Sequence, residues 1–511
     1  MTIPNPDNLM HPPPPADGFD AVGAGRTIEA DVVIVGTGPG GASVGRVLSE
    51  SGLKVVFLEE GPPESRFRPN QAHTMRYHMQ ESGMIVARGS GFLPIAAGRG
   101  VGGGTLINSA LSFQPAPDVL NKWATLLQDD GWGSDAMTPI YDEVSELIGV
   151  GHTQEWFAGE NNRLIKRGVE ALGLDGGLAP RSTPRCVGCG ICNYGCPTGG
   201  KASMNLTLLP VSVEQGALIQ ADTKVTEVMV EQGRAVGVRG FAYHPDTGEQ
   251  GGEVIVRAKR TILSCGAIGT PRLLWGCGLA EQLGPVGEGL HVHPGSAIFG
   301  FCDQEINLWR GATQGAYFHH PDLPGVLPHG FTAPPDVCLM AMDMIGTRLE
   351  EGLNMLPHLA GMVVMISDKG EGTVRATPDG RADVTYHFAP NDIERIKKGM
   401  VETARVLLAG GAREIFTPVH GVGKHTTAES LEDALTPTTI KDFTLYAAHP
   451  MSTCKMGTDP SSSVIAPSGE AHKLPGLHIA DASVFPTSLG VNPQLTTLAV
   501  GTNIGRRMLQ E

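Results

Sequence analysis

The sequence predicts an α/β protein whose first domain is doubly wound and whose second domain follows a different pattern. Three observations lead to this prediction. Residues 30–60 show a strand, a glycine turn, a helix and a second strand in succession, and this rhythm is lost over residues 300–440. The chain of 511 residues also exceeds what one hydrophobic core usually supports, so two or more domains are expected.

The first unit begins with an apolar strand over Val32–Val35 that runs directly into glycines. The helix that follows places Val44 and Leu48 on one face, and a second apolar strand is predicted over Lys54–Leu58. This succession of strand, helix and strand is typical of the start of a doubly wound domain.

The turn after the first strand carries the pattern G-x-G-x-x-G as Gly36, Gly38 and Gly41. Such glycines permit a tight turn and let a pyrophosphate approach the N–H groups at a helix N-terminus. Glu59 ends the second strand, about twenty residues on, where a carboxylate can accept hydrogen bonds from ribose hydroxyls. The sequence therefore predicts a dinucleotide site rather than an ordinary glycine turn, and leaves FAD and NAD both open.

Later elements are predicted from local patterns. They are strands and hairpins over 217–240, a strand and turn over 261–274, a strand-like stretch over 373–389, a helix over 392–411 and a closing helix in the segment 443–511. No repeat of fixed period is visible.

Composition narrows the classes of partner. The net charge is −15, from 38 basic and 53 acidic residues, and no block of like charge stands out, so a nucleic acid is not expected as a partner.

The longest apolar run, residues 359–366, is far shorter than the roughly 20 residues that span a bilayer. Residues 1–29 form a Pro-rich tail without the features of a secretory signal. The default expectation is a reducing, cytoplasmic compartment, where isolated disulfides are rare.

Four cysteines crowd into the segment CVGCGICNYGCPTGGK, residues 186–201. Cys186, Cys189, Cys192 and Cys196 follow C-x2-C-x2-C-x3-C before a proline, which is the bacterial ferredoxin spacing for a [4Fe–4S] cluster. In two-cluster ferredoxins the fourth cysteine ligates the other cluster, and this chain has no second run. An iron–sulfur cluster, a zinc site, disulfides and plain structural thiols all remain open on this pattern.

Several separate segments resemble the glucose–methanol–choline (GMC) flavoprotein oxidoreductases. They are GRGVGGGTLINSAL at 98–111, GAIGTPRLLWGCGL at 266–279, VGEGLHVHP at 286–294, HPMSTCKMG at 449–457 and LHIADASVFPTSLGVNPQLT at 477–496. The matches run from residue 30 to residue 506 in the expected order, so the resemblance covers nearly the whole chain.

The resemblance implies a Rossmann-like FAD-binding domain and a discontinuous second α+β substrate domain built on an antiparallel sheet. The FAD-binding domain is expected from residues 30–115, 205–295 and 441–511, and the substrate domain from residues 296–440. Residues 116–204 are expected to form a helical and loop segment that carries the cysteine-rich loop.

By position in the motifs, the resemblance assigns residues to FAD. The turn containing Gly103 and Thr105, together with Asn108, is expected against the flavin. Val225 matches a position whose backbone touches adenine, and Asp481 lies in the segment that contacts the ribityl chain and pyrophosphate. Ile107 stands where some members carry a histidine that links the flavin covalently, so noncovalent FAD is expected.

His449 and Asn492 correspond to the catalytic pair of the family. Oxidation of an alcohol moves the carbon-bound hydrogen as a hydride to the flavin and the hydroxyl hydrogen as a proton, which histidine is suited to accept near neutral pH. An uncharged asparagine amide can orient the substrate oxygen. Asn492 also precedes a proline, so capping of the last helix is an alternative or additional role. His291 and His293 alternate on a predicted strand and could mimic a metal pair, but the family places them near FAD.

The sequence thus predicts FAD-dependent oxidation of a small-molecule alcohol. Six methionines, which either fill a core or form an adaptable wall around a bulky apolar alcohol, cluster at Met340, Met342, Met344, Met355, Met362 and Met365. The stretch 98–108 is also similar to the cholesterol-oxidase branch.

The cysteine loop bears on where the electrons go. An iron–sulfur cluster would pass electrons from the flavin to an acceptor protein, a quinone or a dye, and the enzyme would then be a dehydrogenase. Without a cluster, O2 could accept the electrons and the enzyme could be an alcohol or sterol oxidase. A redox-silent lyase, similar to the hydroxynitrile lyases, is the competitor from another class, and it would have no use for an electron outlet.

Overall fold

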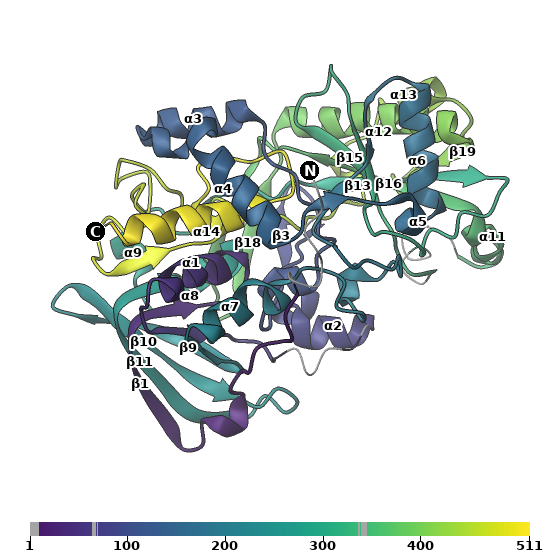
Figure 1. The fold of residues 1–511 in the computed structure, drawn as a ribbon. Coiled ribbons are helices and arrows are strands. Elements are labelled where there is room, and N and C mark those ends of the chain that lie inside the picture. The colour runs from purple at the N-terminus through teal and green to yellow at the C-terminus, as the bar shows by residue number, and fades with distance from the viewer. Residues whose placement is uncertain (1–9, 64–67, 69, 336–337, 339–344, 511) are drawn as a thin grey trace.

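The computed structural model describes residues 10–510 except 64–67, 69, 336–337 and 339–344. Its described part contains two large sheets, a smaller five-stranded sheet and a two-stranded pair (Figure 1). The first large sheet runs in the order β8-β2-β1-β11-β10-β9, and β21 also pairs with β11. Its strands are β1 (Gly25–Val35), β2 (Val55–Leu58), β8 (Leu218–Gln220), β9 (Thr223–Glu231), β10 (Arg234–Tyr243), β11 (Gln250–Leu263) and β21 (Leu477–Ile479).

The centre of this sheet is parallel, and its apolar strands are buried on both faces. β1 pairs in parallel with β2 and β11, whereas β9 and β10 are added as antiparallel strands. All four residues of β2 are fully buried, as expected for a parallel strand covered on both sides. The covering helices α1 (Pro39–Glu50) and α14 (Gln494–Met508) lie side by side although they come from opposite ends of the chain (Figure 1). The predicted doubly wound, Rossmann-like domain is confirmed.

The second large sheet is antiparallel throughout, in the order β20-β19-β13-β16-β15-β14-β6. Helix α12 (Pro390–Gly410) packs on it together with α6 (Glu160–Ala171). This arrangement confirms the predicted α+β domain on an antiparallel sheet. Its strands are β6 (Asp175–Leu178), β13 (Gly295–Cys302), β14 (Ala316–His319), β15 (Val326–Gly330), β16 (Leu359–Ile366), β19 (Ala412–Phe416) and β20 (Lys424–His425).

The five-stranded sheet joins distant parts of the chain. Its order is β12-β17-β18-β3-β4, with β12 (Glu288–Leu290), β17 (Glu371–Ala376), β18 (Ala382–His387), β3 (Val86–Gly89) and β4 (Leu93–Pro94). The strand-like stretch predicted over 373–389 is therefore a hairpin, and it pairs with β12 and β3 instead of with the second large sheet. The remaining pair is β5 (Gly151–His152) with β7 (Pro180–Arg181).

The other helices lie around these sheets. They are α2 (Gln71–His78), α3 (Pro117–Leu127), α4 (Ser134–Leu147), α5 (Glu155–Ala158), α7 (Leu208–Glu214), α8 (Gly266–Gly276), α9 (Ala280–Leu283), α11 (Thr347–Met355) and α13 (Ala428–Leu435). Among the described residues, none of these helices combines the length and apolar character needed to cross a membrane.

The predicted tail, residues 1–29, is only partly described. Residues 25–29 belong to β1 and pair with β11, so the tail boundary was placed too late. Before them, Asp17 exchanges backbone hydrogen bonds with Ile219 and Ala221, so this part of the tail lies along the edge of the first sheet. Residues 1–9 lie outside the described part.

The methionine cluster is likewise only partly described. Met340, Met342 and Met344 lie outside the described residues. Met362 and Met365 are buried on β16 and Met355 packs against a neighbouring apolar cluster, so these three fill core.

Candidate active site

A cavity of about 740 Å³ is lined by residues from both large sheets. Residues from many separate segments form its wall. Of the predicted site residues, its lining contains Gly36, Gly38, Glu59, Gly103, Thr105, Asn108, Val225, His449, Asp481 and Asn492. A volume of this size suits a large cofactor or ligand enclosed by the protein.

The glycine turn is built by close backbone approaches. Gly36 has φ +103°, and a Cβ there would lie 2.3 Å from the carbonyl oxygen of Ser264. Gly103 has φ +56°, and a Cβ there would lie 2.5 Å from the Cα of Gly38. Gly41 does not line the cavity; it lets α1 pack on β1, because a Cβ would lie 2.2 Å from the carbonyl oxygen of Gly36. The turn therefore leaves the N-terminal N–H groups of α1 open to a phosphate.

Glu59 is buried and engaged by four protein donors. Its carboxylate accepts bonds from the Thr37 N–H and hydroxyl, at 3.1 and 2.7 Å, and from the N–H groups of Gly61 and Gly100, both at 3.0 Å. Burial raises the pKa of Glu59 in spite of these bonds. The side chain thus ties the glycine turn to the loop before Gly103, and its contact with a ribose stays a prediction.

Asp481 occupies a similar position on the other side of the turn. Its carboxylate accepts hydrogen bonds from the Gly266 N–H at 2.9 Å, the Thr270 hydroxyl at 2.6 Å and the Ser483 N–H at 2.7 Å. Burial raises its pKa. These bonds join the end of β21 to the first turn of α8, which is one of the resemblance segments.

The side chains of His449 and Asn492 lie next to each other in the cavity wall. The amide nitrogen of Asn492 lies 3.1 Å from Nε2 of His449, although the two residues are 43 positions apart. Burial lowers the pKa of His449 well below its ordinary value, with smaller contributions from His293 and His329, so the imidazole is neutral near neutral pH. Asn492 Oδ1 and His449 Nδ1 have no hydrogen-bond partner within the protein. The pair can therefore receive a hydroxyl group from a ligand.

The helix-capping alternative for Asn492 is wrong. Helix α14 begins at Gln494 with Pro493 in the capping position, and no side chain caps it. The side chain of Asn492 turns to His449 instead. Pro493, Gln494 and Thr497 do line the cavity, so the N-terminus of α14 faces it.

Asn108 is held beside the same helix. Its amide nitrogen donates a hydrogen bond to the side-chain oxygen of Gln494, and its own side-chain oxygen is buried without a partner. Asn108 thus presents an unpaired acceptor close to the wall of the cavity.

Comparison with known proteins places this site in a family. The GMC oxidoreductase family model matches residues 75–295 with its N-terminal part and residues 368–501 with its C-terminal part. The chain is 33% identical over 480 residues to an uncharacterized GMC-type oxidoreductase of Mycobacterium tuberculosis, covering 92% of this chain and 74% of that protein. The chain belongs to the GMC oxidoreductase family.

One further relative of this GMC oxidoreductase and one solved structure of the same fold add detail. A long-chain-alcohol oxidase of Arabidopsis thaliana is 30% identical over 526 residues, covering 94% of this chain and 68% of that protein. The crystal structure of pyridoxine 4-oxidase from Mesorbium loti shares the fold with a TM-score of 0.73 at 16% identity, covering 94% of this chain and 99% of the other.

Family membership settles the choice of cofactor that the glycine motif left open. A solved formate oxidase of Aspergillus oryzae, studied for its FAD modification, also shares the fold with a TM-score of 0.71 at 15% identity, over 97% of this chain and 99% of the other. The cofactor of this GMC oxidoreductase is FAD, and its reaction is an oxidation at a CH–OH group.

Sequence reasoning missed a charged cluster in the cavity wall of this GMC oxidoreductase. Glu60, Arg99 and Arg272 all line the cavity, and Nη2 of Arg272 lies 2.9 Å from the carboxylate of Glu60. Burial alone would raise the pKa of Glu60, but Arg272 and Arg99 outweigh it and the pKa is lowered. Arg272 stands in the segment 266–279, so only its place in that motif could have drawn attention to it.

His291 and His293 do not alternate on a strand as the sequence predicted. Neither residue lies in a strand, and His293 has φ +50°. His291 faces Asp368 instead, and Nε2 of His293 accepts a hydrogen bond from the Gly490 N–H at 3.0 Å.

The cysteine loop packs directly behind the segment 106–109. The ammonium group of Lys201 donates to the carbonyl oxygens of Leu106, Asn108 and Cys192 at 2.9, 2.9 and 3.0 Å. Lys201 is buried, and this burial lowers its pKa to about 8. The loop is thus joined to residues that line the cavity.

The metal site predicted from the spacing of the four cysteines stays a prediction. The structure describes all nine cysteines and places none of them in a disulfide, so the disulfide alternative is absent from this structure. Across the described ranges, no three His, Cys, Asp or Glu side chains are placed to hold a metal ion. Cys192 lies beside the buried guanidinium of Arg181, at 3.3 Å. Burial opposes ionisation of this thiol, but the positive charges of Arg181 and Lys201 outweigh it and lower its pKa.

Proposed function

We propose that this GMC oxidoreductase oxidises a bulky, apolar alcohol with noncovalently bound FAD. In this proposal His449 accepts the hydroxyl proton and Asn492 holds the substrate oxygen. The observation that carries it is the pair itself: a neutral imidazole and a carboxamide, 3.1 Å apart, line a large cavity, and each keeps one buried polar atom without a protein partner.

FAD, when bound, supplies the acceptor for the hydride that leaves the carbinol carbon. The glycine turn, the N-terminus of α1 and the N-terminus of α14 are suited to hold its charged parts, because they present N–H groups to the cavity. Ile107 lines the cavity and offers no nucleophile for a covalent link to the flavin. The residues of the site therefore fit a noncovalent dinucleotide.

The roles of the pair follow from their charge states. Because His449 is neutral, it can take the hydroxyl proton as the hydride departs, and the alcohol oxygen need not become a free alkoxide. Asn492 cannot be protonated or deprotonated at ordinary pH, so it orients the oxygen without competing for the proton.

The apolar part of the cavity supports a bulky substrate. Away from the glycine turn, its wall comes from the second large sheet and the loops beside it. The side chains there are mainly apolar and include Ala297, Phe299, Phe331, Ala333 and Val363. Relatives named long-chain-alcohol oxidases are similar over most of this chain, and a choline oxidase of Arthrobacter globiformis is similar at 24% identity. The apolar wall favours a long-chain alcohol over a charged substrate such as choline.

The test is anaerobic mixing of the holoenzyme with a series of primary alcohols from ethanol to hexadecanol. We expect the flavin absorption to bleach with long chains and to change little with ethanol, because only a long chain covers the apolar wall. Sterols and choline belong in the same series. A flavin that stays oxidised with every alcohol, while a cyanohydrin is cleaved, would replace the oxidoreductase by a lyase.

Two electron acceptors are considered, and a different observation favours each. The names of the relatives favour O2, whereas the ferredoxin spacing of Cys186, Cys189, Cys192 and Cys196 favours an iron–sulfur cluster and an external acceptor. In the part of the chain that the structure describes, no three such side chains are placed to hold a metal ion, so we derive no step through a cluster. Iron and acid-labile sulfide analysis of anaerobically purified protein distinguishes the two. About four iron atoms per chain would establish the dehydrogenase, and fewer than about two the oxidase.

A further inference from the structure

Asp368 is a fully buried carboxylate to which no sequence motif assigned a role. It follows β16 and is about 1% exposed. Its two oxygens accept hydrogen bonds from the Val292 N–H at 2.9 Å, the His293 N–H at 3.4 Å, the Tyr386 hydroxyl at 2.7 Å and the Ser488 hydroxyl at 2.8 Å. A buried carboxylate with this many donors is a fixed anion.

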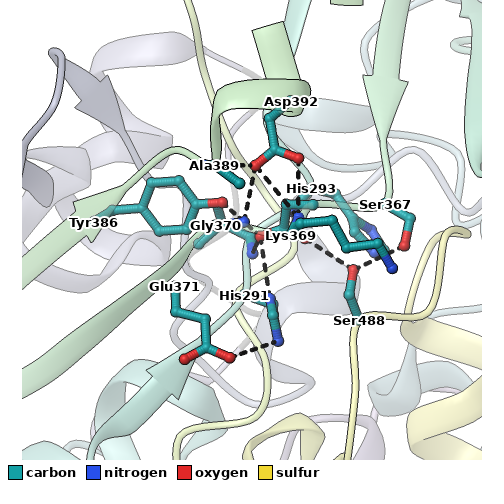
Figure 2. Close-up of polar contacts among 12 residues, drawn as sticks. His291, His293, Ser367, Lys369, Gly370, Glu371, Tyr386, Ala389, Asp392 and Ser488 are labelled. Carbon is teal, nitrogen blue, oxygen red and sulfur yellow. Dashed lines mark hydrogen bonds and ion pairs between the residues drawn. The ribbon is translucent and has the colours of Figure 1, made fainter. Parts of the chain in front are cut away.

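The turn that carries Asp368 is itself fastened by a second buried carboxylate. Asp392, in the first turn of α12, accepts hydrogen bonds from the N–H groups of Lys369, Gly370 and Ala389 (Figure 2). The turn after Asp368 is therefore held against the first turn of α12.

One branch from Asp368 leads to His449. Asp368 binds the backbone of residues 292 and 293, and the preceding residue, His291, exchanges two backbone hydrogen bonds with Met451 at 3.1 and 2.9 Å. Met451 is two residues beyond His449. In addition, the ring of His293 stands edge-on to the ring of His449, with 5.4 Å between centroids.

The other branch leads to Asn492. Ser488 donates its hydroxyl to Asp368, and the N–H of Gly490 donates to Nε2 of His293 at 3.0 Å. Both contacts lie within four residues of Asn492. Ser488 and His293, both labelled in Figure 2, come from different segments of the chain, and each donates a hydrogen bond to Asp368.

We propose that Asp368 is a positioning residue for the proposed catalytic pair: its carboxylate holds the segment of His449 and the segment of Asn492 at a fixed separation and places a negative charge behind the imidazole. The inference rests on the proposed function only where the rate of flavin reduction is measured. The charged and titratable groups that influence His449 are His293, His329 and Asp368, and of these only Asp368 favours the protonated imidazole. Around Asp368 itself lie His291, His293, Tyr386 and Arg395.

The test compares Asp368→Asn with Asp379→Asn. Asp379 is an exposed residue of the turn between β17 and β18, so its substitution removes the same charge far from the pair. We expect Asp368→Asn to retain FAD, to slow anaerobic flavin reduction by at least about 10-fold, and to move the low-pH midpoint of that rate to lower pH. Loss of the negative charge makes His449 a weaker base, so the midpoint moves to lower pH. A rate and midpoint equal to those of Asp379→Asn would overturn the proposal.

Ser488→Ala separates positioning from charge. It removes one contact to the Asn492 segment but leaves the carboxylate ionised, so flavin reduction should slow without a downward shift of the midpoint. If Asp368→Asn does not fold as a holoenzyme, a wild-type rate in Ser488→Ala contradicts the positioning role.

A third measurement does not depend on the substrate. In holoenzyme labelled with ¹³C-histidine, the His449 resonance is the one that disappears in His449→Gln. Its titration midpoint should be lower in Asp368→Asn than in Asp379→Asn. Equal midpoints, or a His449 that never titrates in either variant, would overturn the electrostatic part even where alcohol oxidation itself is confirmed. Failure to find an alcohol substrate would leave this result intact.

Discussion

His449 and Asn492 lie in loops that are distant from each other in the sequence, and the fold brings their side chains together. The loop of His449 is fixed by its backbone bonds to His291, and Asn492 is fixed by its place just before α14. Both side chains retain one buried polar atom without a protein partner. Since unpaired buried polar atoms cost free energy, a site that keeps two of them is organised to bind a polar group of a ligand.

Replacement of His449 by glutamine removes the proposed base but keeps a polar side chain of similar reach. We expect FAD to remain bound, because the glycine turn and α1 are untouched. Flavin reduction by a productive alcohol should slow by roughly 10²-fold or more. Stopped-flow spectroscopy under anaerobic conditions measures this rate, and an unchanged rate would contradict the role of His449.

The pH dependence of the reaction follows from the burial of His449. Burial lowers the pKa of this imidazole well below its ordinary value, and the neutral form is the one that accepts a proton. The rate of flavin reduction should therefore stay on a plateau at pH 6.5 and fall only at distinctly lower pH, as the imidazole becomes protonated. Rates measured from pH 5 to pH 9 check this, and a rate that already falls by half near pH 7 would contradict it.

Some helices and strands could be predicted from the sequence, and others could not. The strand, turn and helix over β1 and α1 were predictable because the glycines, the apolar face and the acid all lie within 30 residues. The pairing of the β17–β18 hairpin with β12 and β3 was not, because those partners lie far away in sequence and leave no local pattern. Asp368 was missed for the same reason: its donors come from residues 292–293, 386 and 488.

The packing of α1 on β1 depends on Gly41. A Cβ at this position would lie 2.2 Å from the carbonyl oxygen of Gly36 and 3.2 Å from Ile34. We expect Gly41→Ala to push the helix away from the strand, to destabilise the protein by about 1–3 kcal/mol and to weaken FAD binding. Gly276→Ala is the matched control, since Gly276 ends α8 and a Cβ there meets nothing within 4 Å.

Thermal unfolding and FAD content measure the two effects of this substitution. The control should melt like the wild type or slightly higher, because alanine favours a helix over glycine. Equal FAD content and equal melting temperatures in Gly41→Ala and the wild type would show that the turn tolerates the methyl group.

At the scale of the whole molecule, the cavity lies where both large sheets contribute side chains, and its wall draws on segments from residue 35 to residue 497. Such a site links parts of the chain that the five-stranded sheet also bridges at β12, β17 and β3. A ligand that fills it binds only the folded arrangement, so its binding free energy adds to the stability of the whole fold.

Removal of FAD should therefore lower the melting temperature, and added FAD should restore it in a concentration-dependent way. With free FAD at about 1,000 times its Kd, mass action predicts a stabilisation of about 4 kcal/mol. FMN is the control, because it lacks the adenylate half that the resemblance places near Val225, and it should restore much less. Calorimetry of the FAD-free protein with each nucleotide measures the effect. Equal recovery with FMN and FAD would show that the adenine side of the cavity contributes nothing to binding, against the assignment of the glycine turn and α1.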